Sequence, residues 1–158
     1  MEPSESLVKR AKDVYNISIE NGYFGKNYLK KHDFVICRHV LEHIPDVESF
    51  IDALVNATND TGKLYIEVPN ADDIFSTNNY SNFFHEHVNY FSPEVLRNAL
   101  RTRGFEEIFF SKNTVHAGSF GILFQRKQKS IDYSGMKKQI ISNVKDLEFL
   151  RNPNISVA

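Results

Sequence analysis

The chain has 158 residues with 41% hydrophobic and 25% charged residues, which is the composition of one ordinary globular domain with a real core. A net charge of −1 gives no general attraction to nucleic acid or to an anionic membrane, and no apolar run approaches the roughly 18 residues of a membrane span. The single cysteine, Cys37, excludes an internal disulfide, and the sequence MEPSESLVKR lacks a signal-peptide core. We therefore expect a cytoplasmic protein that binds neither nucleic acid nor membranes.

The first predicted elements are a helix and a short strand. Ser4 is a good helix cap, and apolar residues from Leu7 to Tyr15 recur at helical spacing after it. Residues 17–19 form a short β-like run, and a glycine-containing loop follows. The sequence therefore predicts a helix, a short strand and a loop before residue 30.

The middle of the chain predicts a strand, a helix and a second strand. Residues 33–41, DFVICRHVL, are nearly all apolar, as in a strand buried on both faces of a parallel sheet. Pro45 favours a helix start, and apolar residues repeat at helical spacing over 47–55. Gly62 is expected to end this helix, and the apolar run 63–69 predicts the next strand.

The carboxyl-terminal half begins with a segment that shows no periodicity, residues 71–91, which we expect to be a functional loop. Residues 92–104 carry a serine cap, a proline at the first helical position and a final glycine, so they predict a helix. The runs 105–110 and 119–127 predict two antiparallel strands at the sheet edge. Residues 132–150 have helical spacing.

This order of elements predicts an α/β fold with a doubly wound sheet. We expect the core to span residues 1–127, and residues 128–158 to form a carboxyl-terminal helix and tail. In open α/β sheets ligands bind outside the carboxyl ends of the strands. The residues that follow each predicted strand are therefore the place to look for chemistry.

Four motifs in collinear order resemble class I S-adenosylmethionine-dependent methyltransferases. RHVLEHIPD (38–46), followed by a helix and GKLYIEVPN (62–70), resembles the segment that follows their fourth strand. EPS (2–4) is similar to the end of their second strand. FFHEHVNYFSPEVLRNALRTRGF (83–105) and HAGSFGILFQRK (116–127) are similar to the subfamily that contains sugar C-methyltransferases.

The resemblance implies a Rossmann-like doubly wound sheet, mostly parallel with an antiparallel edge pair, and S-adenosylmethionine as cofactor. It also implies an amino-terminal truncation, because the family has a first strand and a GxG turn, whereas none of the seven glycines here forms a GxG. A missing strand would leave a hydrophobic strand edge unpaired. We therefore expect a homo-oligomer, such as a homodimer, that associates through exposed strand edges.

The resemblance also implies a set of cofactor contacts. Glu2 stands where the family holds the ribose hydroxyls, for which a carboxylate is a suitable acceptor. The alternative for Glu2 is an acidic residue stabilised by a helix dipole. The other predicted contacts are Asn21 and Tyr23 for adenine, and Arg38, His39 and Val40 for the methionine part of the cofactor.

For catalysis, the resemblance places Glu86 and His87 on acid/base positions of sugar C-methyltransferases, and His43 faces the expected methyl acceptor. Methylating carbon requires removing a proton next to a carbonyl, which histidine does near neutral pH while a glutamate orients the ring. Phe84 stands where active members can have tyrosine. Two alternatives are a metal bound by His85 and His87, and a loop that only fills space under aromatic side chains.

The sequence therefore predicts a methyltransferase that uses S-adenosylmethionine and a histidine base to methylate carbon or oxygen of a small molecule or nucleotide-activated sugar, without a bound metal. One alternative is a non-catalytic fragment that folds and self-associates without binding cofactor. Another is a metal-dependent hydrolase that uses His85 and His87.

Overall fold

The structure is a computed structural model that describes residues 1–78, 83–113 and 118–128. The chain divides into two units, Met1–Lys127 and Gln128–Ala158, and the elements below belong to the first. The helix predicted at 132–150 lies outside the described residues. Within the described ranges, no helix is both long enough and apolar enough to cross a membrane.

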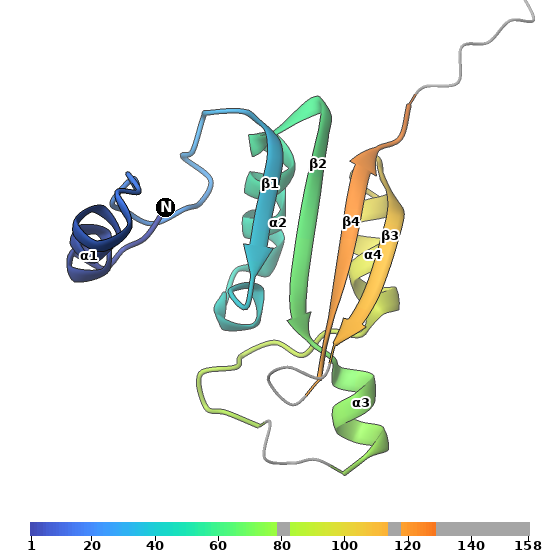
Figure 1. The fold of residues 1–158 in the computed structure, drawn as a ribbon. Helices are drawn as coiled ribbons and strands as arrows, with labels where there is room; N and C mark the ends of the chain where they lie inside the picture. Colours follow the sequence, from blue (N-terminus) through green and yellow to red (C-terminus); the bar gives the residue numbers. More distant parts are fainter. Residues whose placement is uncertain (79–82, 114–117, 129–158) are drawn as a thin grey trace, which may run out of the picture. The chain divides into compact units, whose positions relative to one another are not determined.

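The first unit contains a four-stranded sheet in the order β1-β2-β4-β3 (Figure 1). Its strands are β1 (His32–Arg38), β2 (Thr58–Pro69), β3 (Phe105–Asn113) and β4 (Ser119–Arg126). β1 pairs with β2 in parallel, whereas β2–β4 and β4–β3 are antiparallel. The α/β, Rossmann-like architecture and the antiparallel pair are as predicted, but the described sheet is mixed rather than mostly parallel.

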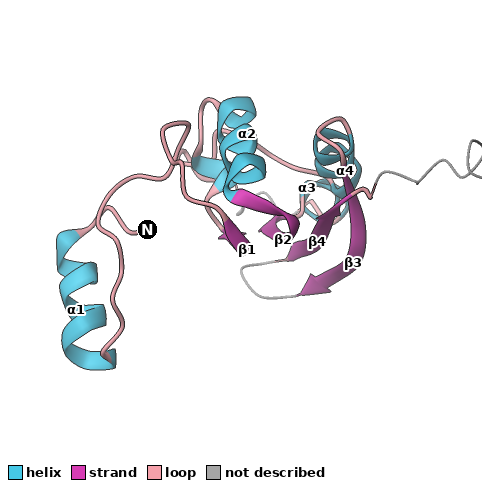
Figure 2. Ribbon diagram, turned by 90° about the horizontal axis from the view of Figure 1, so that it is seen from above, coloured by secondary structure: helices cyan, strands magenta, loops and turns pink. Residues whose placement is uncertain are grey.

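The helices of this unit are α1 (Glu5–Tyr15), η1 (Leu41–His43, a 3₁₀ turn), α2 (Val47–Ala57), α3 (Ala71–Ser76) and α4 (Pro93–Arg101). Figure 2 shows α2 and α4 on the same face of the sheet. Polar caps start them, because Asp46 accepts a hydrogen bond from the Ser49 amide and Ser92 accepts one from the Val95 amide.

The hydrophobic core lies between this sheet face and the two helices. Leu64, Ile66 and Val68 alternate along β2 and are fully buried there, as the two-residue period of a strand requires. Leu96 and Leu100 of α4 are also fully buried. Burying side chains of this size contributes roughly 1.5–3 kcal/mol each, so this layer fixes the carboxyl ends of β1 and β2 where the predicted site residues follow.

The prediction that β1 is buried on both faces is wrong. Phe34 and Ile36 are 52% and 57% exposed, whereas Cys37 on the other side is buried. β1 is an edge of the described sheet, with β2 as its neighbour, and α2 packs on one face only. The apolar run therefore forms a strand at the predicted position. Among the described residues, nothing covers its outer face and no strand pairs with its outer edge.

Two further boundaries differ from the prediction. Residues 17–19 form no strand, and a single parallel bridge between Glu2 and Asn21 stands in that region. The helix expected to run to Gly62 ends at Ala57, and β2 begins at once. Gly62 lies inside β2, where a Cβ atom would come within 3.0 Å of the His32 carbonyl oxygen, so the glycine permits close strand contact.

Candidate active site

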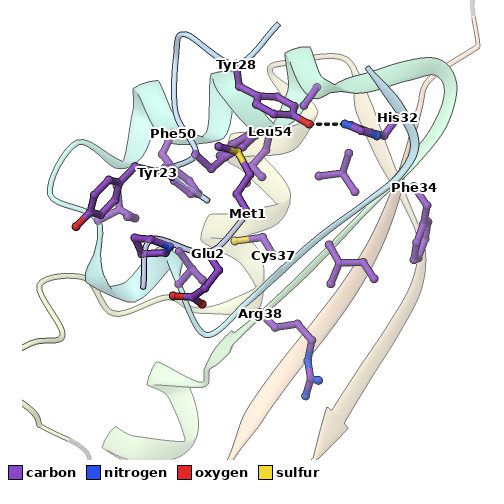
Figure 3. Close-up of a pocket in the computed structure, with 18 residues that line it drawn as sticks. Met1, Glu2, Tyr23, Tyr28, His32, Phe34, Cys37, Arg38, Phe50 and Leu54 are labelled. Carbon is purple, nitrogen blue, oxygen red and sulfur yellow. Dashed lines mark hydrogen bonds between the residues drawn. The ribbon is translucent and has the colours of Figure 1, made fainter. Parts of the chain in front are cut away.

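A cavity of about 760 Å³ lies beside β1, between that strand, α2 and the amino-terminal segment (Figure 3). Four of the predicted cofactor residues line it: Glu2, Tyr23, Arg38 and Val40. Glu2 and Arg38 lie toward one end of the cavity in Figure 3, and Tyr28 with His32 lies toward the other. The structure therefore brings together residues from three separate parts of the predicted cofactor site.

The loop around Glu2 is held by its own hydrogen bonds. The Gly22 amide and the Asn21 side chain both donate to the Glu2 carbonyl. The Glu2 carboxylate accepts a 2.8 Å hydrogen bond from the Ser4 amide at the start of α1, the helix-start role that was the alternative for this residue. Asn21 thus supports the cavity wall without lining it, and Tyr23 is 87% exposed at the rim.

The floor of the cavity contains the only cysteine of the chain, Cys37. Burial raises the pKa of its thiol to about 12, and the nearby Glu42 carboxylate acts in the same direction. The thiol is therefore uncharged at neutral pH. Because the thiolate is the reactive form, Cys37 contributes an apolar surface to the cavity rather than a nucleophile.

The chain turns sharply where β1 ends. His39 adopts a left-handed backbone with φ of 49°, and its amide donates to the Glu67 carbonyl of β2. The η1 turn follows at once and buries Leu41 and Glu42, which are 0% and 2% exposed. This turn carries the predicted His39 away from the cavity lining and toward two buried carboxylates.

Glu42, His43 and His87 form a cluster in which one carboxylate oxygen and one ring nitrogen of each histidine all lie within 4.8 Å of one another. Oε1 of Glu42 is 3.9 Å from Nε2 of His43 and 3.5 Å from Nδ1 of His39. The His43 and His87 rings meet edge to face, with centroids 4.8 Å apart. The structure thus joins the predicted His43 and His87, which are 44 positions apart.

Hydrogen bonds attach the HEH segment to η1. The Glu42 carbonyl accepts from the amides of Val88 and Asn89, and the Asn89 side chain donates to the Ile44 carbonyl at 2.7 Å. Nδ1 of His43 lies 3.0 Å from the Glu86 carbonyl. Since a carbonyl only accepts, Nδ1 of His43 carries the hydrogen, which leaves Nε2 as the basic nitrogen of the neutral ring.

The environment of the half-buried His87 favours the neutral form of its imidazole. Burial lowers the pKa of His87 below its ordinary value, an effect that the Glu42 carboxylate opposes and the His43 ring supports. At pH 7 this ring is uncharged and can accept a proton. Phe84 packs against it with ring centroids 5.0 Å apart, in the position where the resemblance allows a tyrosine.

The other two residues of the HEH motif point elsewhere. The His85 side chain is 93% exposed, and its nearest charged partner is Glu86 at 3.9 Å. The Glu86 side chain is itself 71% exposed. Within the described residues, the metal-compatible group contains His87 with Glu42 and His43, so the structure does not support a metal site built on His85 and His87.

Glu67, on β2, forms a second polar centre beside the cluster. Its buried carboxylate accepts hydrogen bonds from Arg38, Tyr65, Asn113 and Ser119, with the shortest at 2.7 Å from Nε of Arg38. Burial alone would raise the pKa of Glu67, but the hydrogen bonds from Arg38, Asn113 and Tyr65 lower it to about 2. Arg38 therefore links the cavity to the carboxyl ends of three strands.

Comparison with known proteins agrees with this architecture. The sequence profile described as a methyltransferase domain matches residues 1–108. The chain belongs to the methyltransferase domain family. The methyltransferase domain is 26% identical over 125 residues to the C-methyltransferase NovU of Streptomyces niveus, in an alignment that covers 75% of this chain and 30% of NovU. It therefore spans less than a third of that relative.

Solved structures of other methyltransferases share the fold of this methyltransferase domain. Magnesium protoporphyrin IX methyltransferase from Synechocystis PCC 6803 matches with a TM-score of 0.62 at 17% identity, over 79% of this chain and 62% of that one. The N-methyltransferase NodS from Bradyrhizobium japonicum matches with a TM-score of 0.59 at 13% identity, over 80% and 65%. Both structures contain S-adenosylhomocysteine.

Glu42 and Glu67 of the methyltransferase domain are not among the site residues that the sequence predicts. Both glutamates lie in mainly apolar runs, VLEHI and YIEVP, and a carboxylate in such a run is a sign of a paired, buried group. Their partners come from distant positions, such as Ser119 for Glu67, so the sequence offered no way to name them.

Proposed function

We propose that this methyltransferase domain transfers a methyl group from S-adenosylmethionine to carbon or oxygen of a small molecule, with a nucleotide-activated keto sugar as the preferred class of acceptor. His87 or His43 is the base that removes the acceptor proton. The observation that carries the proposal is the half-buried His87, with a ring nitrogen within 4.8 Å of a buried carboxylate oxygen of Glu42, in the cluster that follows the carboxyl end of β1. We also propose a cytoplasmic location, in keeping with the buried free thiol of Cys37.

The proposed cofactor site is the cavity beside β1. Glu2 and Tyr23 would face the nucleoside part, while Arg38 and Val40 would face the methionine part, and Asn21 fixes the Glu2 backbone. The mostly apolar lining with few polar groups suits a nucleoside ligand. S-adenosylmethionine supplies an electrophilic methyl group and leaves as S-adenosylhomocysteine.

The histidine cluster would act on the acceptor. A neutral imidazole removes a proton from the carbon next to a carbonyl, or from a hydroxyl, and the electron pair left on that atom forms the bond to the methyl carbon. The proton stays on the imidazole until solvent removes it. Phe84 and Tyr90 contact the His87 ring, and Phe83 packs against Tyr90. Aromatic side chains of this kind would limit the access of water to the reacting atoms.

Release of S-adenosylhomocysteine tests the proposal. We expect release from S-adenosylmethionine when a nucleotide-activated keto sugar is present, and none when the acceptor is omitted. For carbon methylation, the acceptor incubated with protein in D₂O should also exchange the proton next to its carbonyl. Absence of both product and exchange across a panel of such acceptors would contradict the proposed function.

A second candidate is a non-catalytic domain that self-associates, and the open edge of β1 favours the association. We propose that two copies pair along this edge, because no strand of the described residues pairs with it and it lies beside the exposed Phe34 and Ile36. Pairing of this kind would cover both the apolar face and the edge. Phe34 and Ile36 also line the cavity beside β1, so pairing along this edge would compete with the cofactor for the same surface.

We expect sedimentation velocity to detect a dimer or larger species whose fraction rises with protein concentration. Ile36→Lys should shift the distribution toward monomer, since a lysine on an edge strand disfavours pairing. Val95→Lys is the matched control, because Val95 is equally exposed, at 55%, but lies on α4. A monomer at all concentrations would show that the open edge does not mediate association.

A further inference from the structure

The carboxylate of Glu42 has no assigned role, although it is the most deeply buried charged group in the histidine cluster. Glu42 is 2% exposed, and its Oε1 faces the rings of His39 and His43. Within the described ranges, its second oxygen, Oε2, and the Nδ1 of His87 are both buried without a hydrogen-bond partner. A buried carboxylate with an unused oxygen is costly unless a positive charge forms next to it.

The proposed reaction forms such a charge. When an imidazole of the cluster takes a proton, it becomes a cation next to the Glu42 carboxylate. The hydrogen bond from Nδ1 of His43 to the Glu86 carbonyl leaves Nε2 of that ring facing Oε1 of Glu42 at 3.9 Å. A preformed negative charge at this place stabilises the protonated state more than the neutral one, which is the requirement for lowering the barrier to proton transfer.

We infer that Glu42, rather than Glu86, is the carboxylate that positions and charge-stabilises the histidine base. The Glu86 side chain is 71% exposed, and water screens its charge, whereas Glu42 is buried on η1 and its backbone is bonded to the residues after the HEH segment. Glu86 acts instead through its backbone carbonyl, which fixes the orientation of the His43 ring. This inference rests on the proposed function for its kinetic part only.

Several other ionisable groups face this carboxylate or the His87 ring. They are His39 and Cys37 at the end of β1, His43 on η1, Glu86 in the HEH segment, and Tyr90 just after it. Among the charged groups that act on His87, Glu42 is the strongest. Removing its charge should therefore lower the pKa of His87 further, because the protonated ring loses its nearest counter-charge.

The test is an NMR titration of the whole chain with isotope-labelled histidine. We expect Glu42→Gln to lower the pKa of His87, Glu86→Gln to lower it less, and the exposed Glu48→Gln on α2 to serve as the matched control. Glu42→Asp keeps the charge and should keep the pKa of His87 nearer to that of the wild type. The backbone bonds of Glu42 are unaffected by these changes, and the spectra report directly whether each variant folds.

In the methyl-transfer assay, Glu42→Gln should lower kcat on the order of 10²-fold while KM for the acceptor and the affinity for S-adenosylhomocysteine stay unchanged. The acidic limb of the kcat/KM profile should move to lower pH. An unchanged pKa of His87 in Glu42→Gln, or a larger change in Glu86→Gln, would overturn the inference. So would a stoichiometric zinc ion in the wild type that Glu42→Gln releases, since Glu42 would then be a metal ligand.

Because the titration needs no acceptor and no cofactor, it separates two kinds of failure. If no methyl transfer is found but the pKa of His87 depends on Glu42, the proposed function fails and the electrostatic assignment stands. If methyl transfer is found but Glu42→Gln changes neither the pKa of His87 nor the pH profile, the base is supported by another group and the assignment of Glu42 is wrong.

Discussion

Replacing His87 with alanine is expected to reduce methyl transfer by about 10²- to 10⁴-fold, the usual contribution of a positioned general base. The ring lies beside Glu42 and His43, and burial lowers its pKa so that it is neutral at pH 7. The variant should still bind S-adenosylhomocysteine, because His87 does not line the cavity beside β1. The measurement is S-adenosylhomocysteine release at saturating acceptor.

His85→Ala is the control for this variant. It makes the same chemical change two positions earlier, on a side chain that is 93% exposed and outside the cluster. We expect its rate to stay within a few-fold of the wild type. Equal losses in both variants would mean that the segment acts as a unit and that His87 has no special role, whereas an unaffected His87→Ala would leave His43 as the base.

Glu67→Gln is expected to have the second large effect. It should lower the free energy of unfolding by on the order of 3 kcal/mol at pH 7.5. The substitution removes the charge that Arg38 pairs with, and it places amide hydrogens among donors that need an acceptor. Urea unfolding measures the difference from the wild type. Glu94→Gln, at a site 63% exposed on α4, should change stability by no more than about 0.5 kcal/mol.

The cost of Glu67→Gln should depend on pH. The pKa of Glu67 in the folded chain is about 2, below the ordinary value of 4.5, so the folded state favours the ionised carboxylate. Its stabilising contribution is complete above about pH 4.5 and declines as the pH falls toward 2. The difference between wild type and variant should therefore shrink between pH 4.5 and pH 3.5. A constant difference would mean that packing, and not charge, accounts for the loss.

Local signals in the sequence were enough to predict most of the elements. The helix after Ser4 and the helix after Ser92 both begin at their predicted caps, and the two strands at 105–113 and 119–126 pair antiparallel as expected. These features depend on residues a few positions apart. The prediction that Gly62 ends a helix is wrong. Gly62 lies inside β2, and the close approach of β1 explains why a glycine stands there.

The environment of β1 could not be predicted from its own residues. An apolar run such as FVIC is compatible with a strand covered on both faces or on one, and the difference depends on which neighbours are present. Here α2 covers one face, and Phe34 and Ile36 are exposed on the other. The same limit applies to the site, because the contact of Glu42 with the HEH segment joins positions more than 40 residues apart.

The structure brings some of the predicted site residues together. The resemblance named His43 and His87, which the structure brings together, and four residues that line the cavity beside β1. His39, predicted to contact the cofactor, faces Glu42 and Glu67 instead. The roles of these residues stay predictions until binding and catalysis are measured.

Isothermal titration of the chain with S-adenosylhomocysteine measures whether the cavity beside β1 binds the cofactor product, and it needs no acceptor. We expect saturable binding of one ligand per chain. No heat of binding at high ligand concentration, from protein whose circular dichroism indicates a folded α/β domain, would contradict it. The chain would then have the fold of a methyltransferase domain without its cofactor site.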